Sequence, residues 1–176
     1  MDKIGQRVSS VKRKRIISVW ICMLLVLNVV CLTGCGAGKR WKDGKCTIEC
    51  SSILDNMEAL KETKKEFVPS DGWILKETEV SFKGGETAFD VLKQICGKKG
   101  IHMASRYTPL YKSYYVEGIN QLYEFDCGKN SGWMYSVNGE YPNYGASSYN
   151  LKDGDKVEWR YTCNLGSDVG DKYEGK

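Results

Sequence analysis

The clearest helical period in this 176-residue sequence follows Gly84-Gly85. Apolar side chains recur there at i, i+3, i+4, i+7 and i+8, which predicts one amphipathic helix with a fully apolar face. These positions are Ala88, Val91, Leu92, Ile95 and Cys96. Thr87 and Asp90 have the spacing of a capping box, and Gly100 suits the carbonyl end.

Strand signals surround this helix. Alternation predicts a half-buried strand from Trp73 to Lys83, and three denser β runs come later in the chain. Those runs are Leu122 to Asp126, Gly132 to Val137 and Lys156 to Thr162. With turns at Asn138-Gly139 and Asp153-Gly154, the three runs predict an antiparallel meander. One main helix among several strands indicates the α+β class.

Three other segments carry weaker signals. Thr47 to Cys50 is a short β run, and a helical spacing of mainly apolar residues that starts at Ile53 and continues until Phe67 favours a helix. Residues 101–121 have no sustained period, so they are predicted to be a long irregular stretch, of a kind that often binds something. Its tyrosines are Tyr107, Tyr111, Tyr114 and Tyr115.

Length and charge exclude several classes of protein. The chain is too short for a TIM barrel with a second lobe or for a two-domain dehydrogenase. Residues 1–34 hold six of the 26 Lys and Arg residues and one of the 22 Asp and Glu residues, which leaves 20 positive and 21 negative charges. A domain with nearly equal numbers of positive and negative charges lacks the basic face that nucleic-acid binding requires.

The N-terminus has the order of a targeting segment. Six cationic residues precede an apolar run from Ile16 to Leu32, and the positive-inside bias places the rest of the chain outside the cell. Leu32-Thr33-Gly34-Cys35 resembles the bacterial lipobox, which predicts that Cys35 is lipidated and anchors the protein to the extracellular face of the membrane. An uncleaved anchor helix is the alternative.

Export changes what the cysteines can do. Without Cys22, Cys31 and the lipidated Cys35, five remain, and two disulfides plus a free thiol can be arranged in fifteen ways. If the strand ending before Asn138 pairs antiparallel with the strand after Asp155, then Cys127 lies near Cys163. We therefore predict a Cys127–Cys163 disulfide.

These segments divide the chain into four parts. Residues 1–34 are predicted to be a lipoprotein signal peptide, and residues 35–45, rich in glycine and charge, a tether. Residues 46–165 are predicted to form the domain, and residues 166–176 a flexible polar tail.

A family resemblance covers residues 46–170. Two segments carry it, Ser131-Gly132-Trp133-Met134-Tyr135-Ser136-Val137-Asn138-Gly139 and Leu151-Lys152-Asp153-Gly154-Asp155-Lys156-Val157-Glu158-Trp159. Together with the order of strands and helices, they resemble the transcobalamin-like C-terminal domain family. The resemblance implies a β-grasp-like, mostly antiparallel sheet with one main amphipathic helix. In transcobalamin and intrinsic factor the similar domain closes over one face of a corrinoid, beside a helical barrel for which this chain has no room.

Catalytic motifs are absent from the sequence. It has a single histidine, His102, and no nucleophile elbow, zincin, C-x-x-C or Walker-type glycine motif, so no enzyme is predicted. Asp153, Asp155 and Asp168 could attract a cation, but an Asp-Gly turn explains them better, so neither a metal site nor a cofactor is predicted.

Aromatic and amide side chains concentrate between Trp133 and Tyr149. Flat rings beside amide donors suit a planar ligand, and the loop from Tyr141 to Tyr144 follows a turn, which favours its exposure. The predicted ligand-binding residues are Trp133, Tyr135, Asn138, Tyr141, Asn143 and Tyr144. Strand alternation offers another interpretation of Trp133, Tyr135 and Val137, as residues of the core face.

Two functions follow from these features. The first is a membrane-anchored extracellular binding module for a small ligand, with a cobalamin-like corrinoid as the ligand that the resemblance implies. The alternative is a cell-surface adhesion or protein-interaction module without a small ligand, because surface tyrosines also suit a protein partner. A surface or transporter protein is a further expected partner.

Overall fold

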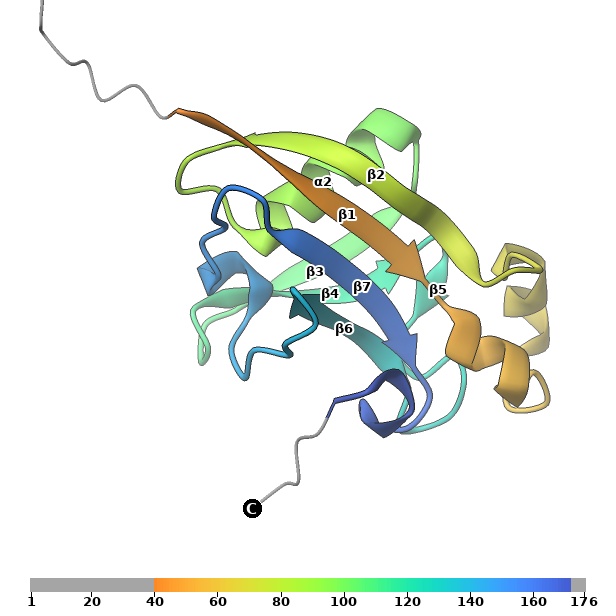
Figure 1. Ribbon diagram of the computed structural model, residues 1–176. Helices are drawn as coiled ribbons and strands as arrows, with labels where there is room; N and C mark the ends of the chain where they lie inside the picture. The colour runs from red at the N-terminus through yellow and green to blue at the C-terminus, as the bar shows by residue number, and fades with distance from the viewer. Residues whose placement is uncertain (1–39, 172–176) are drawn as a thin grey trace, which may run out of the picture. The chain divides into compact units, whose positions relative to one another are not determined.

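The computed structural model describes residues 40–171 (Figure 1). The elements in chain order are β1 (Trp41–Glu49), η1 (Ser51–Asn56), η2 (Glu62–Phe67), β2 (Trp73–Lys83), α2 (Ala88–Lys99), β3 (Met103–Thr108), β4 (Ser113–Ile119), β5 (Leu122–Tyr123), β6 (Gly132–Val137), η3 (Ala146–Ser148), β7 (Lys156–Thr162) and η4 (Ser167–Val169). The four η elements are 3₁₀ helices. Within residues 40–171, no helix is long and apolar enough to cross a membrane. The predicted signal peptide lies outside the described residues.

The strands form two sheets. One has four strands in the order β2-β1-β7-β6, and the other has three in the order β3-β4-β5. All pairs are antiparallel except β1 with β7, which run parallel from Lys45 opposite Lys156 to Glu49 opposite Arg160. Helix α2 lies behind the four-stranded sheet in Figure 1. The predicted α+β class, with one main helix and mostly antiparallel strands, is confirmed.

Helix α2 begins and ends as its sequence predicts. The Thr87 side chain accepts a hydrogen bond from the Asp90 amide, while the Asp90 carboxylate accepts one from the Thr87 amide. This capping box satisfies two amides that would otherwise lack a partner in the first turn. At the other end Gly100 adopts a left-handed conformation, which glycine reaches without steric cost.

A single apolar core lies between the four-stranded sheet, α2 and the smaller sheet. The buried side of α2 meets the inner face of the strands, where Ile48, Phe82 and Tyr161 are almost completely inaccessible to solvent. The smaller sheet contributes Val116 and Ile119 of β4 to the same cluster. The core therefore joins segments that are more than 100 residues apart.

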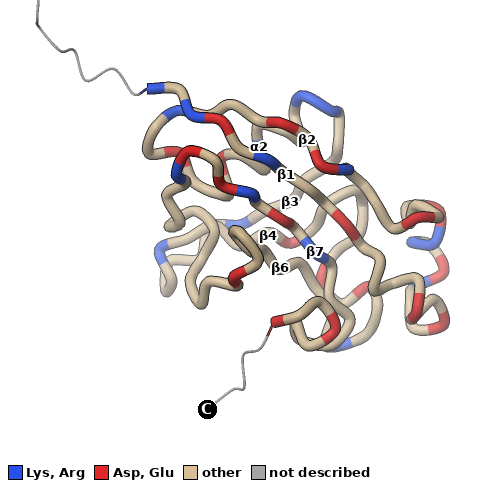
Figure 2. The backbone as a smooth tube through the Cα atoms, in the orientation of Figure 1, with Lys and Arg blue, Asp and Glu red and all other residues tan. Residues whose placement is uncertain are grey.

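The outer face of the four-stranded sheet is charged. Acidic and basic positions alternate along β1 and β7 in Figure 2. The Lys45 ammonium lies 2.6 Å from the Glu77 carboxylate, which also lies 3.4 Å from Lys156, and Arg160 pairs with Glu49 at 2.8 Å. One face of the sheet is thus solvated while the other forms the core.

The structure corrects the predicted elements between residues 51 and 126. The segment with helical spacing forms the two short 3₁₀ helices η1 and η2 rather than one α-helix. Residues 101–121 are a β-hairpin, β3 and β4, and the run from Leu122 to Asp126 supplies only the two-residue strand β5 of the smaller sheet. The predicted meander of three strands is wrong, because β5 pairs with β4 in the smaller sheet and only β6 and β7 pair with each other.

The ends of the domain also differ from the expected positions. Strand β1 begins at Trp41, so five residues of the predicted tether belong to the sheet. At the other end, Ser167–Val169 form η4, and the Val169 carbonyl accepts hydrogen bonds from Tyr141 and Arg160. The domain therefore extends beyond residues 46–165. Backbone pairing in β1 extends it at the N-terminal end, and hydrogen bonds from Tyr141 and Arg160 extend it at the C-terminal end.

Candidate functional site

A rigid connection holds the loop at residues 141–145 against the β3–β4 hairpin. Gly145 lies so close to Ser113, the first residue of β4, that a Cβ atom on Gly145 would sit 1.8 Å from the Ser113 Oγ. The Ser113 and Ser147 hydroxyls are 2.8 Å apart, and the Tyr114 amide donates to the Ser147 Oγ at 2.9 Å. The loop and the hairpin therefore form one continuous surface.

Exposed tyrosines gather on this surface. Tyr144 of the loop is 52% exposed, and at the hairpin tip Tyr111 is 72% and Leu110 81% exposed. We call the following set the tyrosine surface: Tyr107, Tyr111, Tyr114, Tyr115 and Tyr144. An exposed apolar group of this kind marks an interaction site more often than scattered single side chains do.

Ring stacking fixes the orientation of two members of the tyrosine surface. Tyr114 stacks on Phe89 of α2 with ring centroids 4.8 Å apart, and Tyr107 meets Tyr114 edge to face at 5.4 Å. Tyr144 stacks on Tyr149 at 5.8 Å. Because these partners pack against the core, the exposed rings are held in place before any ligand arrives.

A pocket of about 450 Å³ opens between the hairpin and the loop, within the range of small-molecule sites. We call it the hairpin pocket. Its residues are Arg106, Thr108, Tyr111, Ser113, Tyr114, Tyr115, Glu124, Asn143, Tyr144 and Gly145. Aromatic rings form most of its larger side chains, with few charged groups among them.

The charged groups of the hairpin pocket are paired with one another. The Arg106 guanidinium lies 5.3 Å from the centre of the Tyr115 ring and forms ion pairs with Glu117 at 3.3 Å and Glu124 at 3.7 Å. The Tyr115 hydroxyl donates to the Glu124 carboxylate at 2.7 Å. Burial, reinforced by that carboxylate, raises the pKa of Tyr115 above its usual value, so its hydroxyl remains a hydrogen-bond donor at neutral pH.

A second depression, of about 740 Å³, lies on the other side of the 141–145 loop. Tyr141 and Asn143 line it together with Met134 and Asp171. The Tyr141 hydroxyl donates to the Val169 carbonyl at 2.6 Å, and burial raises its pKa. Tyr141 therefore connects the loop to η4, whereas Asn143 also lines the hairpin pocket.

The structure does not bring the six predicted ligand-binding residues together. Asn143 and Tyr144 lie at the hairpin pocket, but Trp133 is only 6% exposed and donates from its indole nitrogen to the Leu122 carbonyl at 2.8 Å. Tyr135 shares the core face with Trp159, and its hydroxyl donates to the Tyr144 carbonyl at 2.8 Å. Trp133 and Tyr135 therefore lie on the core face of β6, which is the second interpretation that strand alternation offered.

The Asn138 side chain stabilises the turn that follows β6. Its amide nitrogen donates to Asp155 and its carbonyl oxygen accepts from the Lys156 amide, both at 2.9 Å. The positive φ values of Asn138 and Gly139 match the expected Asn-Gly hairpin turn. Both polar ends of the Asn138 side chain thus have partners in the fold.

The hairpin supplied pocket residues that the predicted site did not include. In the sequence, Tyr111, Tyr114 and Tyr115 lie in a stretch without a sustained period. The three tyrosines fall within five residues beside Pro109, and this clustering could have indicated a binding site. Only the β3–β4 hairpin places their side chains on one surface.

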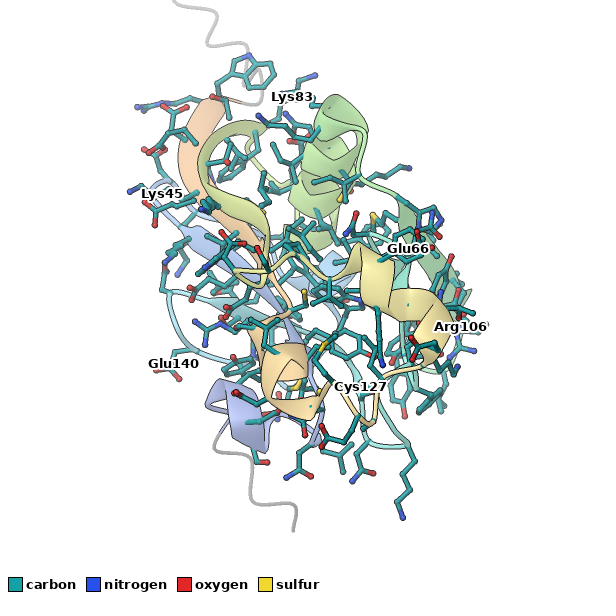
Figure 3. The ribbon with its side chains drawn as sticks, turned by 90° about the vertical axis from the view of Figure 1, so that its right-hand side faces the viewer. Lys45, Glu66, Lys83, Arg106, Cys127 and Glu140 are labelled. Atoms are coloured by element: carbon teal, nitrogen blue, oxygen red, sulfur yellow. The ribbon has the colours of Figure 1, made fainter. Side chains whose placement is uncertain are left out.

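The structure brings Cys127 and Cys163 together. The predicted antiparallel pairing of β6 and β7 is confirmed, with Gly132 opposite Thr162. Both thiols are free, the Cys163 sulfur lies 3.7 Å from the Ser52 hydroxyl of η1, and burial raises the pKa of Cys163 to about 12. Figure 3 shows Cys127 beside η1, whose Asn56 carbonyl is 3.5 Å from its sulfur. The disulfide itself stays a prediction.

Asp153, Asp155 and Asp168 accept hydrogen bonds from backbone amides. Asp153 accepts from the Asp43 amide, Asp155 from the Lys152 amide, and Asp168 from the Cys163 amide. Among residues 40–171, no three His, Cys, Asp or Glu side chains are grouped so that they could hold a metal ion. The His102 ring instead contacts Tyr123, with its Nε2 3.3 Å from the tyrosine hydroxyl.

Comparison with known proteins relates this fold to others. Residues 85–163 match the family described as "Domain of unknown function (DUF4430)". No curated protein matches the chain. Haptocorrin in complex with Cbi is similar in structure, with 16% identity and a TM-score of 0.51, over 72% of this chain and 26% of haptocorrin. A candidate metal-binding protein from Ruminococcus gnavus ATCC 29149 is 15% identical, with a TM-score of 0.41 over 69% of this chain and 96% of that one.

The fold is an α+β domain that is similar in structure to haptocorrin, as the resemblance in the sequence implied. The part that matches the DUF4430 family, residues 85–163, extends from the turn before α2 to the end of β7. The chain spans about a quarter of the length of haptocorrin.

Proposed function

We propose that this protein is a binding module for a small ligand, without catalytic activity, and that the hairpin pocket and the tyrosine surface form its binding site. The observation that carries the proposal is the pocket of about 450 Å³ whose aromatic walls come from the hairpin and the 141–145 loop. Concave sites lined by aromatic side chains and a few polar groups are typical of small-ligand sites.

A corrinoid is the ligand class that we propose. Its flat macrocycle suits the exposed rings of Tyr111 and Tyr144, while the exposed Asn143 side chain offers hydrogen bonds to peripheral amides. The likeness to haptocorrin, whose solved structure contains Cbi, supports this choice. A macrocycle is larger than the pocket, so one face would stay uncovered, and we expect weaker binding than in a carrier that encloses its ligand.

Titration of the purified full-length chain with cobalamin and with cobinamide tests the proposal. We expect a change in the corrinoid absorption spectrum and measurable heat. Tyr144→Ala should raise Kd about tenfold, as the truncation of a central aromatic contact does. Trp41→Ala is the matched control, since Trp41 is 62% exposed but does not line the hairpin pocket. No heat or spectral change with either corrinoid would contradict the corrinoid proposal.

The exposed hairpin tip favours a second candidate function, that of a protein-interaction module. Leu110 and Tyr111 at the tip are both largely exposed, and tyrosine provides contact area at low entropic cost. A partner at the tip could also cover the uncovered face of a ligand. Capture of a surface or transporter protein that is lost in Leu110→Ser, in the absence of any corrinoid response, would favour this alternative.

Anchoring to the extracellular face of the membrane through Cys35 is the remaining part of the proposed function. The support is the order of charged residues, apolar run and Leu32-Thr33-Gly34-Cys35. Metabolic labelling with a fatty-acid probe should label the parent chain but not Cys35→Ala, which should be released or mislocalised. An unlabelled parent chain would contradict lipidation.

A further inference from the structure

An exposed tryptophan and several lysines lie where the described chain begins. Trp41 is the first residue of β1, and the Lys83 ammonium is 5.5 Å from the centre of its indole ring. Figure 3 shows Lys83 at the end of the domain where the described chain starts. The Gly84 amide donates to the Arg40 carbonyl at 3.0 Å, which fixes the start of β1 to the turn before α2.

A depression of about 630 Å³ connects Trp41 with α2. Lys83, Lys93 and Lys98 line it and are exposed, and we call these three lysines with Trp41 the Trp41 patch. Arg40 beside it is also exposed. The patch combines an amphipathic ring with long cationic side chains, the combination that membrane-water interfaces favour.

The acidic residues of this depression are oriented toward the backbone. The Glu86 carboxylate accepts from the Lys83 amide at 2.7 Å, and the Asp90 carboxylate accepts from the Thr87 amide and hydroxyl. The lysines therefore extend into solvent from a surface whose carboxylates are held in local hydrogen bonds. Such a surface complements anionic lipid headgroups.

The position of the patch along the chain agrees with this partner. Trp41 follows the proposed lipidated Cys35 by six residues. Six residues span at most about 20 Å when fully extended. An anchor at Cys35 would therefore keep the Trp41 patch within that distance of the bilayer surface.

We propose that the Trp41 patch docks the domain directly on an anionic bilayer, with the indole at headgroup level and the lysines against lipid phosphates. The proposal rests on the anchoring part of the proposed function and is independent of the ligand. Docking gives the domain one orientation on the membrane, whereas a tether alone would let it rotate.

Quenching of Trp41 fluorescence by brominated lipids tests the docking. The full-length chain is reconstituted into phosphatidylcholine vesicles with or without phosphatidylglycerol, and the Trp41 signal is the parent spectrum minus that of Trp41→Phe. We expect bromolipid quenching of this signal in the anionic vesicles and its loss in pure phosphatidylcholine. Unquenched Trp41 in anionic vesicles that carry the chain would overturn the proposal.

Charge reversal separates docking from tethering. Lys83→Glu with Lys98→Glu should abolish the quenching, while Lys76→Glu with Lys129→Glu, an equal charge change at exposed lysines outside the patch, should preserve it. Equal quenching in both double variants would overturn the role of the lysines.

Sedimentation with the vesicles and corrinoid titration identify which proposal fails. A chain that sediments with unquenched Trp41 is anchored but not docked. A chain that does not sediment overturns both anchoring and docking, and the titration reports on the ligand site in either case. Tyr144→Ala should leave Trp41 quenching unchanged.

Discussion

Gly145 lies against Ser113 with no room for a side chain, although its backbone angles, φ −65° and ψ 144°, are open to any residue. The constraint is therefore steric. We predict that Gly145→Ala lowers the free energy of unfolding by about 1 to 3 kcal/mol, as overpacking of a close contact does, and weakens ligand binding. Denaturant unfolding of the full chain measures the first effect.

Gly97→Ala is the matched control for this glycine. It lies within α2, where an added Cβ meets nothing within 4 Å. Alanine is the better helix former, so we expect unchanged or slightly increased stability. A Gly145→Ala protein as stable as the parent would show that the loop and hairpin can separate without cost.

Cys127 and Cys163 are predicted to form a disulfide in the exported chain. Both sulfurs lie against η1, that of Cys127 beside the Asn56 carbonyl and that of Cys163 beside the Ser52 hydroxyl. By the chain-entropy estimate the bridge would stabilise the fold by about 3 to 4 kcal/mol, so the double Ser variant should melt well below the oxidised parent. Under reducing conditions the difference should shrink.

Peptide mapping of the oxidised chain gives an independent result. Burial raises the pKa of Cys50 and of Cys96 to about 12, as it does for Cys163, so none of these thiols reacts readily as a thiolate at neutral pH. Oxidation would need an oxidant or a catalyst of exchange. Finding Cys163 joined to Cys50, or unpaired, would overturn the assignment.

At the scale of the element, the start of α2 depends on its capping box. Thr87→Ala removes the side-chain acceptor of the Asp90 amide, and we predict a loss of about 1 kcal/mol in the free energy of unfolding. Thr87→Ser keeps the hydroxyl and should retain most of that stability. Equal losses in both variants, measured by urea unfolding, would assign the effect to the lost methyl group instead.

The β3–β4 hairpin shows why an element can escape prediction. Its residues pair in register from Arg106 opposite Tyr115 to Thr108 opposite Ser113, but both faces of β3 are largely polar or exposed. A strand without a buried face has no alternation of apolar residues for a pattern to detect. The sequence therefore showed a high local content of tyrosine but did not show that these tyrosines lie together on a hairpin.

At the scale of the whole molecule, the charged face of the larger sheet makes stability depend on pH. The hydrogen bond from Lys45 lowers the pKa of Glu77 below its usual value, with Lys156 adding to the effect. A lowered folded-state pKa stabilises the fold above the unfolded value, and this contribution is lost as pH falls through the folded-state value.

Glu77→Gln tests this dependence. We expect the variant to be less stable than the parent near pH 7 and to match it at a pH below the lowered Glu77 pKa, with a smaller difference at high salt. Glu66→Gln is the control, because Glu66 is exposed and the described residues show no ion pair for it. Urea midpoints across the acidic range measure both, and parallel curves for parent and Glu77→Gln would contradict the linkage.

Local chemistry made several features predictable from the sequence alone. The period of α2, its capping box and the turn at Asn138-Gly139 depend on residues within one or two turns of each other. The pairing of β6 with β7 also followed from two strong β runs joined by turn residues. For such features, backbone sterics and short-range hydrogen bonds are decisive, so the sequence by itself determined them.

Only the tertiary structure decided the strand order and the site. The parallel pairing of β1 with β7 joins residues 45 and 156, and nothing local records which distant strand will cover an apolar face. Alternation placed Trp133 and Tyr135 on one face of a strand, but the packing of the smaller sheet against β6 made that face part of the core. Tyr144 and Tyr111 became neighbours through the contact of Gly145 with Ser113. Burial is a property of the assembled chain, and it selects which aromatic residues stay available to a ligand.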